Sequence, residues 1–538
     1  MEPITTKFTI IFMPDGKKAE VPAGITAAEA ADIAGVHIGR HCGGAGVCGK
    51  CRVAVKTDDP LAPLTPTEEE RLSKEDISNG YRLSCCANIK RSGTLYVIDG
   101  VKSEGHSILE GFYSEINNWQ EGRSGFGIAV DIGTTTVVCY LLDYRKHEAK
   151  DRISFLNPQV TFGDDVISRI AYSSASDEAL VKIQKTLTDE MEKNILRLAE
   201  RNNVAKEDIT EIIIAGNTVM EHLFAGVSPE SIGHSPYSPQ FLLMPPFAAS
   251  KIGININETC AVKMISNVAG YVGADIVAGV AAIDMDIQDK MRLLVDIGTN
   301  NEIVIGNKDK MFCCATAAGP ALEGARIQYG MRAAEGAIEK VYLEDGQLKY
   351  STIGNVKPIG LCGSGLIDAI SLLLNEKVIE KSGRFVYPEK CTDLRFAHRL
   401  CRTPKGMIQI LLTDEDNPVY LTQKDIREVQ LAVGAVKVGI EVMLEREGIT
   451  LAQLDEVCLA GAFGNNINIE SAVRVGLLPD VPHNRIVGIK NSSGLGACMA
   501  GARPSFYDRT KITAEKMVYV ELSSLPDFQK RFVAAMSF

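Results

Sequence analysis

Short alternating runs of apolar and polar residues begin the chain and predict a small unit rich in strands. Residues 8–12 read as a strand, Asp15-Gly16 gives a turn signal, and the chain returns as a strand near Val21, which together predict a β-hairpin. Residues 26–29 have the form of a capping box and precede good helix formers, so a helix is expected after the hairpin. Gly35 suits the C-terminal end of that helix.

Farther along, two parts of the chain share one order of apolar strands and glycines. Residues 127–134 (GIAVDIGT) match residues 292–299 (RLLVDIGT), and residues 211–216 (EIIIAG) match residues 456–461 (EVCLAG). Such self-similarity indicates a duplicated unit. Because apolar strands are followed by helical stretches in both copies, each copy is expected to form a central sheet flanked by helices.

The spacing of these features predicts how the chain is divided. Each copy ends with a helix rich in glycine and alanine, near 272–284 and near 494–502, and the wider spacing in the second copy indicates an insertion within 320–420. We expect an α/β and α+β protein of several domains. The expected parts are a first domain at 1–100, a linker at 101–125, a first lobe at 126–288, a second lobe with the insertion at 289–508, and a C-terminal extension at 509–538.

The composition fits a folded protein and excludes several classes of function. Of the 538 residues, 45% are apolar and 23% are charged, and the net charge of −11 does not favour binding to nucleic acid or to an anionic membrane. The most apolar stretch, 268–283, contains Asp275 and is shorter than the roughly 20 residues that a membrane-spanning helix needs. The first residues lack the pattern of a signal peptide, and 14 cysteines without one are typical of reduced thiols in the cytoplasm.

The cysteine spacing is the strongest metal signal in the sequence. Cys42, Cys48 and Cys51 lie in one glycine-rich loop, and Cys85 and Cys86 follow after a long gap. Two irons and two sulfides need four cysteine ligands, and glycines allow the loop backbone to wrap closely around such a cluster. A structural zinc site is the alternative, but zinc knuckles usually present two Cys-x2-Cys pairs, which the adjacent Cys85 and Cys86 do not provide.

The spacing Cys-x5-Cys-x2-Cys with a distant fourth cysteine resembles the adrenodoxin-like branch of the [2Fe–2S] ferredoxins. This resemblance implies a β-grasp fold for the first domain. Residues 82–85 (RLSC) are similar to the Arg-Leu-Ala-Cys ending of that family, which implies Cys85 as the fourth ligand. Cys86 stands where the family commonly has glutamine, and its role is left open.

The duplicated Asp-x-Gly-Thr turns predict a phosphate site. Gly133 and Gly298 let backbone N–H groups approach phosphate oxygens, and Asp131 and Asp296 suit Mg²⁺ bound through water. One such motif would be an ordinary turn as readily as a phosphate loop, but two copies favour the site. The expected donors are Gly133, Thr134, Thr135, Thr136, Gly298, Thr299 and Asn300. No Gly-x4-Gly-Lys-Ser/Thr motif occurs, which excludes Walker-type chemistry.

The paired motifs resemble the two phosphate loops of the acetate-kinase, sugar-kinase, Hsp70 and actin (ASKHA) superfamily, whose lobes have an RNase H-like repeat and clamp ATP. Residues similar to its adenosine motif are Gly461, Ala462, Phe463 and Gly464, and Gly273 and Gly494 begin helices placed like those at its hinge. Gly363 and Ser364 begin a helix that either faces the nucleotide or forms a tight structural turn. Asn301 stands where glycine is expected. Asp165 is a candidate for positioning water, but capping a helix is its more ordinary role.

The combination of ferredoxin domain, linker and two-lobed ATPase resembles the reductive activators of corrinoid proteins in methyltransferase and O-demethylase systems. The resemblance implies ATP-dependent reduction of Co(II) to Co(I) in a partner corrinoid protein, with a [2Fe–2S] cluster, ATP, Mg²⁺ and an unidentified low-potential electron donor. The alternatives are an activator of another low-potential metalloenzyme, a small-molecule kinase with a regulatory ferredoxin domain, and a redox-regulated Hsp70-like binding module. The sequence leaves the oligomeric state open, a homodimer included.

Overall fold

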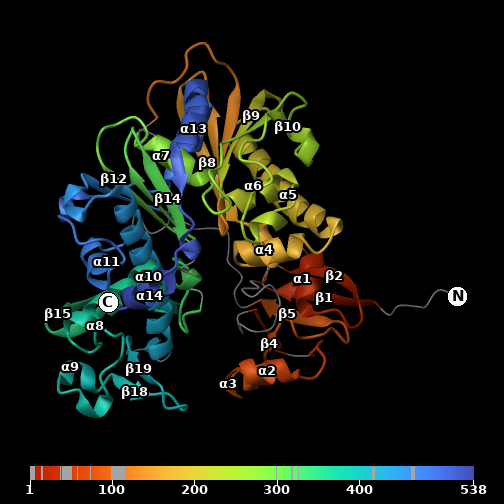
Figure 1. The fold of residues 1–538 in the computed structure, drawn as a ribbon. Coiled ribbons are helices and arrows are strands. Elements are labelled where there is room, and N and C mark those ends of the chain that lie inside the picture. The colour runs from red at the N-terminus through yellow and green to blue at the C-terminus, as the bar shows by residue number, and fades with distance from the viewer. Residues whose placement is uncertain are drawn as a thin grey trace.

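The structure is a computed structural model of the 538-residue chain. It describes all residues except 1–6, 14–15, 35, 37, 39–50, 57–58, 73, 98–115, 299, 317–318, 325, 415–417 and 462–466. Figure 1 shows an N-terminal module in red and two larger lobes, the first in orange to yellow-green and the second in green to blue. Within the described part of the chain, no helix combines the length and the apolar character needed to cross a membrane.

The N-terminal module is a five-stranded sheet in the order β2-β1-β5-β3-β4. Its strands are β1 (Lys7–Met13), β2 (Lys17–Pro22), β3 (Arg52–Ala54), β4 (Tyr81–Leu83) and β5 (Gly93–Val97), and its helices are α1 (Ala27–Ile33), α2 (Pro66–Arg71) and α3 (Lys74–Ser78). The antiparallel pairing of β1 with β2 confirms the predicted hairpin. The capping box of α1 is also confirmed, since Thr26 and Glu29 bond reciprocally. Gly35 lies outside the described residues.

The first lobe is built on a six-stranded sheet in the order β10-β11-β9-β6-β7-β8. Its strands are β6 (Phe126–Ile132), β7 (Thr136–Asp143), β8 (Glu148–Leu156), β9 (Ile209–Gly216), β10 (Phe247–Ala248) and β11 (Ala261–Met264). Its helices are α4 (Val166–Ser173), α5 (Asp177–Arg201), α6 (Thr218–Ala225) and α7 (Ala274–Ala282). β6 runs antiparallel to β7 and parallel to β9, so the first Asp-x-Gly-Thr motif lies at a sharp turn between two central strands.

The second lobe repeats this topology in the order β22-β21-β12-β13-β14-β23. Its strands are β12 (Arg292–Ile297), β13 (Asn301–Gly306), β14 (Met311–Thr316), β21 (Glu456–Ala460), β22 (Ile486–Gly488) and β23 (Met517–Tyr519). β12 runs antiparallel to β13 and parallel to β21, as β6 does with β7 and β9, which confirms the predicted repeat. The chain after residue 508 contributes the edge strand β23 to this sheet.

The remaining elements of the second lobe surround this sheet. Between β14 and α10 lie two three-stranded sheets, formed by β15 (Ala337–Glu344), β16 (Gln347–Thr352) and β17 (Gly360–Leu361), and by β18 (Leu400–Arg402), β19 (Ile408–Leu411) and β20 (Tyr420–Thr422). The helices are α8 (Gly363–Asn375), α9 (Leu394–Ala397), α10 (Gln423–Glu447), α11 (Ile469–Val475), α12 (Ser492–Ala502), α13 (Pro504–Lys516) and α14 (Phe528–Ala535).

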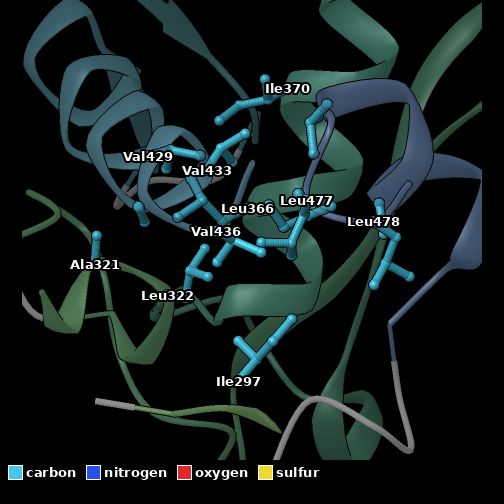
Figure 2. Packing of buried hydrophobic residues seen from close by; sticks show 14 of the residues in the cluster. Ile297, Ala321, Leu322, Leu366, Ile370, Val429, Val433, Val436, Leu477 and Leu478 are labelled. Carbon is cyan, nitrogen blue, oxygen red and sulfur yellow. The ribbon is translucent and has the colours of Figure 1, made fainter. Parts of the chain in front are cut away.

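A large apolar core supports the second phosphate turn. Figure 2 shows Leu366, Val436 and Leu477 pointing toward one another from α8, α10 and the segment after α11. Ile297 belongs to the same core and is completely buried at the end of β12, directly before Gly298. Burial of this side chain fixes where the strand ends and the turn begins.

The two lobes meet along α7 and α12, which pack closely because their contact faces are small. A Cβ atom at Gly496 would lie 2.3 Å from the Ala278 backbone oxygen, and one at Gly279 would lie 2.7 Å from the Ser492 hydroxyl. The first helix follows Gly273, as expected, whereas α12 begins at Ser492, two residues before the predicted Gly494. Asn491 explains the earlier start, because its side chain caps the helix by accepting a hydrogen bond from the Gly494 N–H at 2.7 Å.

Replacing Gly496 with alanine is expected to lower the free energy of unfolding by about 1–3 kcal/mol, because the added methyl group meets backbone that cannot rotate away. Alanine has the higher helix propensity, so propensity alone predicts the opposite sign. The matched control is Gly279→Ala, whose methyl group meets a hydroxyl that can rotate. Calorimetric melting of both variants is the measurement, and equal stability would contradict close backbone packing at this hinge.

Candidate functional site

A cavity of about 310 Å³ lies where the turns of the two sheets face each other. It brings together the predicted residues Asp131, Gly133, Thr134, Thr135, Thr136, Asp296, Gly298, Asn300, Gly363, Ser364 and Gly461. These residues come from both lobes, so one ligand in the cavity would contact both copies of the repeat. The predicted Thr299, Ala462, Phe463 and Gly464 lie outside the described residues.

The turn between β6 and β7 is tight, and buried side chains hydrogen-bond to it. The Gly133 N–H donates to the Thr136 carbonyl at 3.0 Å, and a Cβ atom on Gly133 would lie 2.6 Å from that oxygen, so only glycine fits. Asn217, at the N-terminus of α6, donates to the Thr134 hydroxyl at 3.0 Å. The completely buried Arg169 donates to the Thr134 carbonyl at 2.5 Å. These contacts fix the backbone that faces the cavity.

Asp131 links this turn to the hinge helix of the other lobe. Its carboxylate accepts hydrogen bonds from Asn491 at 2.8 Å and from Ser493 at 2.7 Å, both in the first turn of α12. Burial raises the pKa of Asp131, although these two hydrogen bonds oppose the shift. Sequence reasoning missed Asn491 and Ser493. The only sequence signal was the Asn-Ser-Ser-Gly run of a helix cap.

The carboxyl groups that line the cavity include those of Asp131, Asp275, Asp296 and Glu302. Burial, and then repulsion by Asp296, raise the pKa of Asp275 to about 8. Burial, and then repulsion by Asp131, raise the pKa of Asp296 to about 7. Burial likewise raises the pKa of Glu302 well above its usual value. A cation would relieve this repulsion, so the residues present fit a divalent metal ion.

The arrangement suits a hydrated metal ion better than a directly ligated one. Among the residues that the structure describes, no group of three His, Cys, Asp or Glu side chains converges to hold a metal ion. Mg²⁺ keeps several waters and uses few carboxylates, so water can bridge it to Asp131 and Asp296. Asp165 does not line the cavity; it caps α4 by accepting a hydrogen bond from the Ser168 N–H at 2.7 Å.

Asn301, which stands where glycine was expected, is completely buried, and neither polar atom of its side chain has a hydrogen-bond partner.

Two further features of the second lobe face the cavity. Helix α8 presents its N-terminus there through Cys362, Gly363 and Ser364, which favours the phosphate-facing alternative for this segment. Gly461 has a positive φ of 83°, and a Cβ atom on it would lie 2.6 Å from the Asp296 carboxylate. A side chain larger than hydrogen would therefore displace Asp296 from the cavity wall.

The N-terminal module brings together the cysteines that are described there. Cys51 lies directly before β3 and Cys85 two residues after β4, and their Sγ atoms are 3.1 Å apart. Cys86 Sγ lies 3.6 Å from Cys85 Sγ, so proximity alone does not exclude it as a ligand. None of these three cysteines forms a disulfide. Cys42 and Cys48 lie outside the described residues, and the described thiols fit one side of an iron–sulfur site.

A buried ion pair positions the strand that leads to Cys85. Arg82 donates to the Glu68 carboxylate at 2.9 and 3.0 Å, and Glu68 is completely buried. Burial alone would raise the pKa of Glu68, but the hydrogen bonds from Arg82 and from backbone N–H groups lower it overall. Removing one partner would leave a buried charge, so α2 and β4 are held together strongly.

Comparisons with known proteins agree with this geometry. Family models match the chain at residues 12–90 as a 2Fe-2S iron-sulfur cluster binding domain, at 126–288 as the RACo middle region, and at 290–538 as the C-terminal, ASKHA domain of RACo. The solved structure of a reductive activator for a corrinoid iron–sulfur protein superposes with a TM-score of 0.69 at 30% identity, covering 99% of this chain and 98% of that one.

Two curated proteins extend the similarity. The corrinoid activation enzyme RamQ of Eubacterium limosum is 37% identical over 420 residues, which cover 76% of this chain and 70% of RamQ. A Co(II) methylated amine-specific corrinoid protein reductase of Methanosarcina barkeri is 23% identical over 401 residues, which cover 68% of each chain. The expected fold class, a [2Fe–2S] ferredoxin domain followed by an ASKHA ATPase, is thereby confirmed. The chain belongs to the family of reductive activators of corrinoid proteins.

Proposed function

We propose that this protein uses ATP to reduce the inactive Co(II) form of a partner corrinoid protein to Co(I). The observation that carries the proposal is the cavity between the duplicated Asp-x-Gly-Thr turns, in the same chain as the closely spaced thiols of Cys51 and Cys85. One electron enters from a low-potential donor, and one electron leaves to cobalt, so the reaction balances without loss of a group from either protein.

The thiols of Cys42, Cys48, Cys51 and Cys85 are the proposed ligands of a [2Fe–2S] cluster. The cluster would carry one electron, at a reduction potential of about −400 mV if it behaves as a plant-type centre. That reduction potential is not negative enough to reduce the most reducing protein-bound metals unless further free energy is supplied. Nucleotide can supply this free energy if it binds two arrangements of the lobes unequally, because a ligand shifts an equilibrium only by its difference in affinity for the two states.

The cavity residues have separate roles in this proposal. The Gly133 and Gly298 N–H groups bond within their own turns, so the other backbone N–H groups of these turns and those at the start of α8 bind the phosphate oxygens of ATP. Asp131 and Asp296 hold Mg²⁺ through water, and neutralise its charge together with the phosphates. Because these groups belong to both lobes, bound MgATP draws the lobes together about α7 and α12.

The partner and the cellular setting follow from the same chemistry. The acceptor is the Co(II) corrinoid protein of a methyltransferase system, of which O-demethylation is one example. No cysteine among the described residues forms a disulfide, which supports a reducing compartment, the cytoplasm.

The test combines the purified holoprotein, a strong reductant, MgATP and a Co(II) corrinoid protein, and follows the absorbance of Co(I). Co(I) is expected to form with MgATP and not when ATP is omitted or replaced by a non-hydrolysable analogue. Free phosphate should appear in step with Co(I). A phosphorylated small molecule in place of free phosphate would support the kinase alternative, and equal Co(I) formation without ATP would contradict the proposal.

A further inference from the structure

Helix α12 contacts two functional parts of the molecule, one at each end. Its first turn holds Asp131 in the cavity through Asn491 and Ser493. At its other end, the carbonyl of Gly501 accepts a hydrogen bond from Arg123, and that of Ala502 accepts from the Gln120 N–H at 3.1 Å. Eleven helical residues at 1.5 Å each place these ends about 16 Å apart.

Residues 116–125, here called the anchor segment, follow the ferredoxin module in sequence and precede β6. Besides its bond to Gly501, Arg123 donates to the buried carboxylate of Glu211 on β9. Its guanidinium also lies 3.7 Å from the ring centre of Tyr144. One side chain therefore ties the anchor segment both to strand β9 and to the end of α12.

Trp119 packs in the same place. Its ring lies 6.4 Å from that of Tyr144 and stacks on His147 at 6.1 Å with an interplanar angle of 14°. Its indole N–H donates to the Ile116 carbonyl at 3.0 Å, which closes the anchor segment on itself. Any shift of the segment relative to the first lobe changes the surroundings of this indole.

Arg123 is not needed to balance the charge of Glu211. Lys263, on β11, also donates to Glu211, at 2.7 Å, and Tyr144 adds a hydroxyl hydrogen bond. Burial alone would raise the pKa of Glu211, but the hydrogen bonds from Lys263, Tyr144 and Arg123 lower it overall. Arg123 differs from Lys263 in that it also bonds to the end of α12, next to the bond that the Gln120 N–H makes to Ala502.

Small residues bring α12 into close contact with its neighbours. A Cβ atom at Gly496 would strike the backbone of α7, and one at Gly501 would lie 2.4 Å from the Leu142 side chain, so the helix has almost no side-chain layer between it and the first lobe. Because a closely packed contact deforms little, α12 is expected to change between discrete positions rather than to bend gradually.

We propose that Arg123 is a positioning residue that transmits occupancy of the cavity to the anchor segment. MgATP competes with Asn491 and Ser493 for the carboxylate of Asp131, which releases the first turn of α12. The helix then shifts against the first lobe, and its Gly501 end moves relative to Arg123 and Trp119. The inference rests on the proposed function, since it requires ATP to bind in this cavity.

The first test uses the unmodified holoprotein, because Trp119 is the single tryptophan of the chain. Addition of MgATP is expected to change tryptophan emission saturably, with the same half-saturation as ATP hydrolysis. Hydrolysis that saturates while emission stays constant would overturn the inference and leave the proposed function standing. Absence of both ATP binding and hydrolysis would overturn the proposed function, and the inference with it.

The second test compares Arg123→Met with Lys263→Met. Each variant leaves Glu211 with one cation, so each has a similar cost in stability, but only the first loses the bond to Gly501. Arg123→Met is expected to keep the KM for ATP and the rate of hydrolysis, while Co(I) formed per ATP falls at least tenfold. Lys263→Met is expected to keep that ratio.

The Arg123→Lys variant separates the effect of the hydrogen bond to Gly501 from the effect of the positive charge beside Glu211. Lysine keeps the positive charge, but it lacks the planar fork with which arginine reaches a carbonyl and a carboxylate together. The ratio of Co(I) to ATP in this variant should lie between those of the wild type and Arg123→Met. Equal ratios for Arg123→Met and Lys263→Met, in proteins of equal melting temperature, would overturn the proposal.

Discussion

Replacing Cys51 with serine is expected to remove the iron–sulfur cluster and abolish Co(I) formation, while ATP hydrolysis continues. Cys51 is almost completely buried, with 1% exposure, and its Sγ lies 3.1 Å from that of Cys85, so serine at this position removes one of the sulfurs that the proposed cluster needs. The cavity proposed to bind ATP is lined by residues from 131 onward and does not involve this module. Iron and acid-labile sulfide analysis and the visible spectrum are the measurements.

The controls for this prediction are Cys86→Ser and Cys85→Ser. The ferredoxin resemblance assigns Cys85 as the fourth ligand, yet Cys86 Sγ lies only 3.6 Å away. Cys86→Ser should therefore keep a full complement of iron, and Cys85→Ser should lose it. The reverse result would assign Cys86 as the ligand, and loss of iron in neither variant would contradict a cluster at this position.

Replacing Asp131 with asparagine is expected to slow ATP hydrolysis about 100-fold or more, because the charge that holds the hydrated metal ion against the phosphates is lost. The fold should tolerate the change. Burial raises the pKa of Asp131, which weakens the preference of this site for the charged form, so a neutral amide of the same size is expected to keep the fold. Phosphate release, the dependence of that rate on Mg²⁺ concentration, and the melting temperature are the measurements.

Asp165→Asn is the matched control for this prediction. Asp165 caps α4, and asparagine caps helices as well as aspartate does, so hydrolysis and stability should remain close to those of the wild type. A loss of hydrolysis comparable to that of Asp131→Asn would identify Asp165 as the acid that positions water. Normal hydrolysis in Asp131→Asn would show that the metal ion is held elsewhere.

The sequence predicted the features that depend on neighbouring residues. Gly133 is required because the chain turns between two strands within a few residues, and its N–H bonds to Thr136. The capping box of α1 and the hairpin of β1 and β2 are local in the same sense. The repeat could be found because equivalent strands and turns recur in the same order in both lobes.

The choice between alternatives needed the structure. Whether Gly363 and Ser364 form a structural turn or face the nucleotide depends on where α8 lies relative to the other lobe, and they line the cavity. The residues that hold Asp131 escaped prediction because Asn491 lies 360 positions away along the chain. A short helix-cap sequence gives no sign of which distant carboxylate it will meet.

By itself, therefore, the sequence determined the modules and their chemical types: thiols spaced for a cluster, and two turns shaped for phosphate. Only the tertiary structure decided how these parts are connected. It joined Arg123 to Gly501 across 378 positions, and it brought Asp131 and Asp296 close enough to Asp275 to raise the pKa of Asp275. The physical reason is that backbone geometry and ligand spacing act over a few residues, whereas the contacts that couple distant sites depend on strand order and on the packing of one lobe against the other.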